Sequence, residues 1–262
     1  MSLAAYLLIG FNLLSKAGAV AIFAVAPWSA VGGWLLADAV VLYHLLVPGA
    51  QGLVRVHRSF APSRREVWLT IDDGPDPEDT PQILALLAEQ GARATFFVIG
   101  EAVERYPELV RAIVAGGHEV AHHTHTHPLA SFWCATPRKL RDELDRPLVA
   151  LRALGVEPRW FRSPAGVNNF WLQPALDRRG LEFVGWSVRG LESASREADE
   201  VVARVRRGLR PGAIILLHEG PRVPAAVRLH ALRGVLAMLR AEGYAAVLPE
   251  AAQLRRVLPS AV

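Results

Sequence analysis

The sequence contains little cysteine and little lysine, and no repeat or low-complexity tract. Its 262 residues include one cysteine, Cys134, so no disulfide can form within the chain. The redox compartment stays open, because many periplasmic domains also lack disulfides. The formal net charge of +4 comes almost wholly from arginine, with Lys16 and Lys139 as the only lysines. No nucleic-acid motif accompanies the arginines, so we expect them to be solvated and predict no nucleic-acid partner.

Apolar residues are concentrated in the first fifty positions. Residues 1–26 and 31–47 form two apolar runs on either side of Pro27, and each is close to the about 20 residues needed to cross a bilayer. Lys16 and Asp38 lie at similar distances from Pro27. In two antiparallel helices they would share one depth, where each charge could neutralise the other.

Three interpretations of these runs compete. A cleaved signal peptide would need a basic start, but no basic residue precedes Lys16, and Pro27 would directly follow the cleavage-like 24–26 segment. A buried hairpin within the globular domain is the second interpretation. We favour the third, in which residues 1–50 form a membrane-anchoring helical hairpin.

A basic linker is predicted over residues 51–65. It carries Arg55, Arg58, Arg64 and Arg65 directly after the second apolar run. By the positive-inside tendency, these residues and the domain that follows lie on the cytoplasmic side of a bacterial-type inner membrane. Because the hairpin crosses twice, the N-terminus would lie on the same side.

From residue 66 to 262, short apolar runs alternate with helical patterns, which predicts one α/β catalytic domain. The expected strands are residues 67–71, 94–99, 118–121, 160–162, 183–188, 213–217 and 244–248. The expected helices are residues 80–91, 101–115, 136–155, 172–179, 198–209 and 225–241. Seven β/α alternations favour a parallel barrel or sheet, in which sites form at the C-terminal ends of strands. Asp72, Asp73, His123, Arg162 and His218 all fall at such ends.

Two short segments look like halves of one metal site. Asp72 and Asp73 end an apolar run, and His123 and His127 lie four residues apart. One carboxylate and two imidazoles can hold a divalent cation while the second carboxylate takes a proton from water. His218 could supply the opposite proton transfer. An extended segment would put His123, His125 and His127 on one face, whereas a helix would pair His123 with His127; we favour the helix.

Taken singly, each motif has an ordinary structural explanation. The aspartate pair before Gly74 and Pro75 could be a turn that ends a strand, and the histidine cluster could be a solvated tract. His218 alone would be a core histidine. Their joint order and spacing make a site the better interpretation.

The motifs together resemble those of the polysaccharide deacetylase family, whose members carry a NodB-like domain. The resemblance covers about residues 67–248 and rests on the segments Thr70–Pro75, Gly117–Pro128, Phe161–Gly166 and Leu216–His218. It implies a distorted seven-stranded (β/α) barrel. It also implies one divalent metal ion held by Asp73, His123 and His127, with zinc expected and cobalt or nickel as alternatives.

The same resemblance implies roles for other residues. Asp72 would be the general base, held in place by Arg162, and His218 the general acid. The backbone N–H of Ala165 would contribute to an oxyanion hole, and Leu216 would line an acetyl pocket. Two further residues are expected on the substrate side: Pro164 and Trp186.

The sequence departs from the family pattern at two places. Ala165 stands where an aromatic residue is frequent, which removes a side-chain contact. Glu192 and Ser193 stand where many members carry aspartate and tryptophan. Glu192 could still orient His218, but the missing tryptophan would remove one apolar wall of the substrate groove.

The resemblance implies a hydrolase that removes N-acetyl groups from an amino sugar, with an N-acetylated glycan or a lipid-linked sugar, and the membrane, as partners. The altered groove favours a lipid-linked or small saccharide over a long polymer. Two alternatives remain open: an amidase acting on a non-sugar C–N bond, and a carbohydrate-binding pseudoenzyme that has drifted at the fourth motif.

Overall fold

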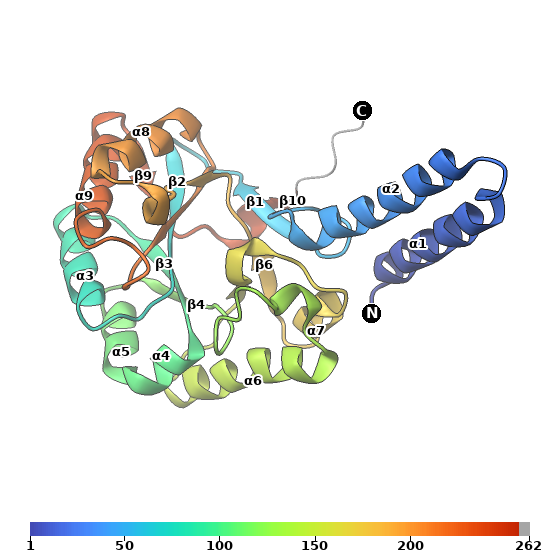
Figure 1. The fold of residues 1–262 in the computed structure, drawn as a ribbon. Helices are drawn as coiled ribbons and strands as arrows, with labels where there is room; N and C mark the ends of the chain where they lie inside the picture. Colours follow the sequence, from blue (N-terminus) through green and yellow to red (C-terminus); the bar gives the residue numbers. More distant parts are fainter. Residues whose placement is uncertain (257–262) are drawn as a thin grey trace.

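The computed structural model describes residues 1–256, which form a helical hairpin and an α/β body (Figure 1). The hairpin consists of α1 (Leu3–Ile22) and α2 (Pro27–Leu46). The Ser2 side chain caps α1 by accepting from the Ala5 N–H, and Pro27 begins α2, where its missing N–H costs no helical hydrogen bond.

Both helices are long and apolar enough to span a membrane. Few of their residues are buried, and Trp28 for example is 87% exposed. The Lys16 Nζ lies 2.8 Å from the Asp38 carboxylate, so the expected pairing of these two charges is confirmed. Asn12 also donates to Asp38, over 3.0 Å.

The body is built on a curled sheet whose strand order is β10-β1-β6-β5-β4-β3-β2-β8-β7, with β9 beside β2. The strands are β1 (Val56–Phe60), β2 (Glu66–Asp72), β3 (Ala94–Val98), β4 (Glu119–His122), β5 (Trp160–Phe161), β6 (Glu182–Val184), β7 (Val188–Arg189), β8 (Ile214–His218), β9 (Ala245–Ala246) and β10 (Leu254–Arg256). Paired strands run parallel except β1 and β10. A bridge from Ser59 to Ala213 curls β1 toward β8. The distorted parallel barrel expected from the sequence is thereby confirmed.

Helices connect the strands in the described part of the chain. They are α3 (Asp79–Glu89), α4 (Gly100–Arg105), α5 (Pro107–Ala115), α6 (Pro137–Ala153), α7 (Leu172–Asp177), α8 (Ala198–Gly208) and α9 (Arg228–Ala241). The Thr136 side chain caps α6 by accepting from the Lys139 N–H. The single helix expected over residues 101–115 is two helices, because Pro107 has no N–H to continue α4 and instead begins α5.

The structure differs from the sequence prediction at β1, at β10, which was not predicted, and at the strand expected over residues 183–188. Residues 51–65 were expected to be a linker, but they contain β1, whose polar His57 contacts Glu182 across 2.8 Å. The strand expected over residues 183–188 is two strands, with β6 between β1 and β5 and β7 beside β8. The chain thus passes from one region of the curled sheet to another near Gly185.

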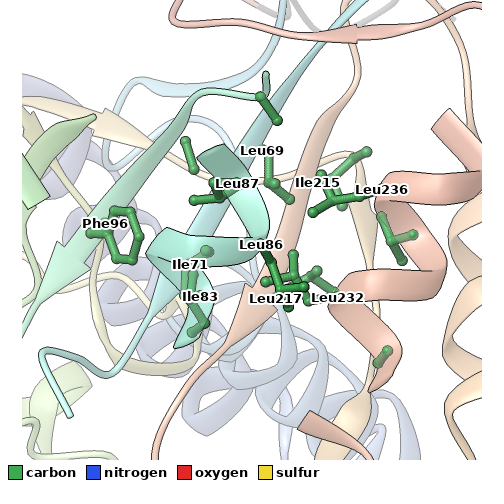
Figure 2. Close-up of a cluster of buried hydrophobic side chains, with 14 of the residues drawn as sticks. Leu69, Ile71, Ile83, Leu86, Leu87, Phe96, Ile215, Leu217, Leu232 and Leu236 are labelled. Atoms are coloured by element: carbon green, nitrogen blue, oxygen red, sulfur yellow. The ribbon is translucent and has the colours of Figure 1, made fainter. Parts of the chain in front are cut away.

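A buried apolar cluster fixes the strands that carry the candidate site. Side chains of β2, β3 and β8 pack against α3 and α9 (Figure 2): Leu69, Ile71, Phe96, Ile215 and Leu217 face Ile83, Leu86, Leu87, Leu232 and Leu236. All residues of β3 are buried, as is usual for parallel strands that are covered on both faces. The C-terminal ends of these strands are therefore held by close packing.

Candidate metal centre

The C-terminal ends of four strands bring the chemically active residues together. Asp72 ends β2 and lies beside His218, the last residue of the neighbouring strand β8. His123 follows β4 and Arg162 follows β5, as the β/α alternation predicts. Because parallel strands end at the same edge, residues far apart in sequence meet there.

Asp73, His123 and His127 present three ligand atoms that all lie within 4.8 Å of one another. The Asp73 Oδ1 is 3.5 Å from the His123 Nε2 and 3.3 Å from the His127 Nε2. This carboxylate oxygen is buried and accepts no hydrogen bond from the described residues. An unsatisfied buried oxygen facing two ring nitrogens fits a divalent cation, and one carboxylate with two imidazoles is a common catalytic zinc set.

A left-handed backbone explains how adjacent aspartates serve one site. Successive side chains of a strand point to opposite faces. At Asp73 the φ angle is 78°, so the chain leaves the β conformation directly after Asp72. Gly74 follows, and a Cβ placed there would lie 1.7 Å from the Glu219 carboxylate, so this close approach requires glycine.

The prediction that His123 and His127 lie on a helix is wrong. Residues 123–128 form a loop, in which Thr124 and His127 have φ angles of 64° and 50°. The loop is fixed by other segments instead. Gly100 and Glu101, at the start of α4, donate their N–H groups to the Thr124 and His125 carbonyls. These N–H groups are available because the first N–H groups of a helix have no partner within the helix.

Glu143 of α6 holds the same loop from its other side. Its buried carboxylate accepts the N–H groups of His125 and Thr126, each over 2.9 Å, and the Thr126 hydroxyl over 2.7 Å. Lys139 lies 2.9 Å from the second oxygen of this carboxylate. Glu143 has no sequence signal that links it to the histidines, because the contact depends on how α6 packs.

Ring hydrogen bonds decide which nitrogens can bind a cation. The His123 Nδ1–H donates to the Arg162 carbonyl over 2.8 Å, which leaves the lone pair of its Nε2 facing Asp73. The Nδ1 of His127 instead accepts from Arg222. A neutral imidazole that binds a cation through Nε2 carries its proton on Nδ1, so cation binding and this Arg222 contact exclude each other.

The ionisation states of Asp73 and His127 suit the binding of a cation. Burial alone would raise the pKa of Asp73, but the close approach of His123 and the charges of His123 and His127 hold it well below its usual value. Burial, followed by the His123 charge, lowers the pKa of His127 to about 3. At neutral pH, therefore, Asp73 is ionised and the His127 ring is neutral.

Asp72 is held by a fully buried arginine. The Arg162 Nη1 donates to the Asp72 Oδ1 over 2.6 Å and to the Thr70 hydroxyl, while Nε and Nη2 donate to the Val184 and Gly185 carbonyls. The second Asp72 oxygen lies 3.6 Å from the His123 Nε2 and so faces the cation position. This arrangement leaves one Asp72 oxygen available beside the candidate ligands.

Glu192 fixes both the backbone and the ring of His218. Its buried carboxylate accepts the His218 N–H over 2.8 Å and lies 3.2 Å from the His218 Nδ1. Burial opposes a charged imidazole, but the hydrogen bond and charge of Glu192, followed by the charges of Asp72 and Asp73, raise the pKa of His218 to about 9. The ring therefore carries a proton at neutral pH.

A pocket of about 350 Å³ opens over these residues. Trp186, Ala165 and Leu216 line it as expected, whereas Pro164 is buried and does not. Ser193 lines it at the position of the missing tryptophan. The rest of the wall was not predicted, because no local pattern marks it: Leu129, Ser163, Arg189, Leu191, Arg222 and Val223.

The unusual backbone conformations gather at this pocket. In the described part of the chain, five residues other than glycine have positive φ angles: Asp73, Thr124, His127, Ala165 and Leu191. Four of them line the pocket, and Thr124 separates the two candidate histidine ligands. Such conformations cost about 1–3 kcal/mol each and persist where surrounding structure imposes them, commonly at functional sites.

The other histidines of the cluster face elsewhere. The His122 ring contacts the Leu144 carbonyl through Nε2 over 2.9 Å, and burial lowers its pKa to about 4. His125 is buried, and neither ring nitrogen has a hydrogen-bond partner among residues 1–256. His118 contacts the Ala94 N–H, as expected for a histidine that satisfies the backbone.

Comparison with known proteins agrees with this arrangement. Residues 61–184 match the family described as polysaccharide deacetylase. A chitooligosaccharide deacetylase from Bradyrhizobium sp. (strain ANU 289) is 44% identical over 161 residues, which cover 60% of this chain and 71% of the relative.

Solved structures of similar proteins include an esterase and a pseudoenzyme. A family 4 carbohydrate esterase from Streptomyces lividans, in complex with acetate, is 32% identical with a TM-score of 0.66, covering 75% of this chain and 98% of its own. A family 4 pseudoenzyme from Bacillus anthracis is 27% identical with a TM-score of 0.65, covering 73% of this chain and 66% of its own. Similarity of fold alone therefore does not decide activity.

Proposed function

Because the chain belongs to the polysaccharide deacetylase family, we propose that it is a metal-dependent hydrolase that removes the acetyl group from the nitrogen of an amino sugar. The observation that carries this proposal is the joint arrangement around one pocket. Asp73, His123 and His127 converge there, while Asp72 and His218, at the ends of neighbouring strands, line the same pocket.

Hydrolysis of an acetamide needs an activated water, a stabilised oxyanion and a proton for the departing amine. A divalent cation held by Asp73, His123 and His127 would polarise the carbonyl and acidify water. Asp72 would accept the proton of that water with the oxygen that Arg162 leaves available. Arg162 keeps Asp72 oriented, because its guanidinium is fixed by three further acceptors.

His218 would donate a proton to the amine as the C–N bond breaks. Its raised pKa keeps the proton in place at neutral pH, and Glu192 fixes the ring through Nδ1. The Nε2 then faces the pocket. The Ala165 N–H would bind the oxyanion, a contact worth about 3–4 kcal/mol in comparable sites. Leu216, almost fully buried, would contact the acetyl methyl group.

The groove favours a short or lipid-linked saccharide. Ser193 lines the pocket where many family members carry tryptophan, so one stacking surface for a long glycan is absent at that position. A drifted binding protein is the competing interpretation, since one similar structure is a pseudoenzyme. The presence of Asp72, Asp73, both histidine ligands and His218 in one connected arrangement supports the enzyme.

Acetate release tests the proposal directly. Purified full-length protein, loaded with zinc, cobalt or nickel, would be assayed on N-acetylated monosaccharides, oligomers and lipid-linked sugars. We expect release from at least one class and none from the matched Asp72→Asn protein. Bound sugar without release from any member of the panel would favour the pseudoenzyme, and release from a non-sugar acetamide alone would favour the other amidase.

Replacing Glu192 with glutamine should change the pH dependence of turnover. His218 acts in its protonated form, so activity falls as pH rises through its pKa. Removing the Glu192 charge lowers that pKa, and we expect the alkaline limb of the kcat profile to move to lower pH by about 1–3 units. Glu197→Gln, on the exposed surface, is the control. An unmoved alkaline limb would remove Glu192 from this role.

We also propose that α1 and α2 anchor the protein in a membrane. Their exposed apolar surfaces and the Lys16–Asp38 ion pair support insertion of both helices. The full chain should remain with membranes after alkaline carbonate extraction and retain residues 1–50. Release by carbonate, or a mature N-terminus after residue 26, would contradict the anchor.

The same anchor carries a proposal about sidedness. Arg55, Arg58, Arg64 and Arg65 follow α2, which favours a cytoplasmic body. A reporter fused after Val262 reads this side. Activity of a reporter that works only in the periplasm would place the body outside the cytoplasm.

A further inference from the structure

The end of α2 is hydrogen-bonded to a segment that follows the wall of the candidate site. Buried Asn168 donates through its Nδ2 to the His44 and Ala50 carbonyls, over 2.8 and 3.1 Å, and through its N–H to the Leu45 carbonyl over 2.7 Å. Asn168 lies three residues after Ala165, which lines the pocket. These contacts join the foot of the hairpin to the segment that carries the proposed oxyanion donor.

Pro48 comes still closer to the pocket. A Cβ placed on Gly166 would lie 3.1 Å from the Pro48 Cβ and 2.6 Å from the ring of Trp186. Gly166 also has a φ angle of 68°, which favours glycine. The chain that leaves α2 is thus separated from a pocket-lining side chain by the space of one glycine.

The start of α1 is attached to the body as well. Ala5 is fully buried in an apolar cluster that contains Leu45 and residues of the body, and Figure 1 shows the hairpin extending away from the β1–β6 side. A hollow beside Met1 is lined by Arg138, Arg141, Arg178 and Arg179. Arginines at the foot of a membrane hairpin suit anionic lipid head groups. If the hairpin spans a bilayer, the side of the catalytic pocket that Trp186 lines, next to the end of α2, lies at the bilayer surface.

Two arginines that have no role in the proposed hydrolysis add positive charge to the pocket. Arg189 and Arg222 both line it, Arg189 is exposed, and the Arg222 side chain is 51% exposed. Within residues 1–256, no acidic group lies within 4.0 Å of Arg189. Arg222 lies 3.8 Å from the Asp73 carboxylate, but a bound divalent cation would balance the charges of Asp72 and Asp73.

Cation binding would also release Arg222 from its second partner. The His127 Nδ1 accepts from Arg222 only while the His127 Nε2 carries the proton. When Nε2 binds a cation, Nδ1 becomes a donor and that contact is lost. The guanidinium then needs another acceptor beside the cation position, and its fork suits carboxylate or phosphate oxygens.

We propose that Arg222 and Arg189 bind the phosphate of an N-acetylated amino sugar that is linked through this phosphate to a lipid of the bilayer. This inference rests on the proposed deacetylase function and identifies its substrate class. In a 2-acetamido sugar 1-phosphate, the acetamido group and the phosphate are on neighbouring ring carbons. The phosphate of such a substrate must therefore bind next to the catalytic centre, and Arg222 lies there. The lipid must also reach the bilayer, and α2 ends at that side of the pocket.

The test compares three acetamido sugars with the cation-loaded full chain in phosphatidylcholine vesicles. They are a long-chain isoprenyl phosphate-linked sugar, the free sugar 1-phosphate and a neutral alkyl glycoside of the same sugar. We expect kcat/KM to be highest for the lipid-linked phosphate, about 10–100-fold above the neutral glycoside. Arg222→Gln or Arg189→Gln should remove most of this difference, whereas exposed Arg233→Gln should not.

Each contrary result has a distinct meaning. Equal rates for the neutral glycoside and the phosphate would overturn anion recognition, as would an equal loss on both substrates in Arg222→Gln protein of unchanged metal content. Equal rates for free and lipid-linked phosphate would overturn the lipid as the source of the phosphate.

Binding separates this inference from the proposed function. The free sugar 1-phosphate would be titrated into cation-loaded Asp72→Asn protein with and without Arg222→Gln. Arginine-dependent binding without turnover of any substrate by the native chain would sustain the phosphate site and refute the deacetylase. Absence of binding would refute the phosphate site, whether or not acetate is released.

Discussion

Asp72→Asn should lower kcat by about 10²–10⁴-fold while the protein keeps one bound divalent cation. The asparagine oxygen can still accept from Arg162, which lies 2.6 Å from the Asp72 Oδ1, so the shape of the site is preserved. The amide cannot take a proton from water, and that step is lost. Turnover and bound metal are measured on the same preparation.

Stability must be followed in this variant, because Arg162 is fully buried and loses its charged partner. Removing one member of a buried pair typically costs about 3–5 kcal/mol, so the assay belongs well below the measured Tm. Asp142→Asn, on the exposed surface of α6, is the matched control. Normal turnover with stoichiometric metal would exclude Asp72 as the base.

Asp73→Asn should have the opposite signature, with loss of metal first and loss of activity as its consequence. The Asp73 Oδ1 is the only carboxylate oxygen in the three-ligand cluster identified among residues 1–256. A cation that supplies several kcal/mol of charge stabilisation accounts for about 10³-fold or more in kcat/KM. Metal content after dialysis and equilibrium zinc binding would measure the effect.

Added metal distinguishes the two aspartates. Excess zinc or cobalt should restore part of the activity of Asp73→Asn by mass action, but none of the activity of Asp72→Asn. The reverse pattern would mean that the two aspartates have exchanged roles. Full metal affinity in Asp73→Asn would dismiss the cluster as the metal centre.

The sequence was sufficient to predict the α/β class, the two apolar helices and the residues that meet at the strand ends. Apolar runs of three to six residues between helical patterns are local signals, and the parallel arrangement follows from their alternation. The placement of Asp72 and His218 at strand ends needed no more than this, whereas the pairing of β2 with β8 is found only in the structure. The pairing of Lys16 with Asp38 followed from their equal distance from Pro27.

Local patterns could not predict how the side chains reach one another. His123 and His127 meet through a loop held by α4 and Glu143 rather than through a helix, and Asp73 reaches them through a left-handed backbone. β1 was missed because its five residues mix polar and apolar side chains, so only pairing with β6 and β10 identifies it as a strand.

The residue types and their spacing were enough to predict which groups could perform the chemistry: two carboxylates, a histidine pair, an arginine and an acid. Their tautomers, their ionisation and the pocket around them follow only from the folded structure. It also decided that α2 ends beside Trp186 and that Arg189 and Arg222 face the centre. These properties depend on contacts between residues of different segments, such as Glu192 with His218, which no periodicity in the chain encodes.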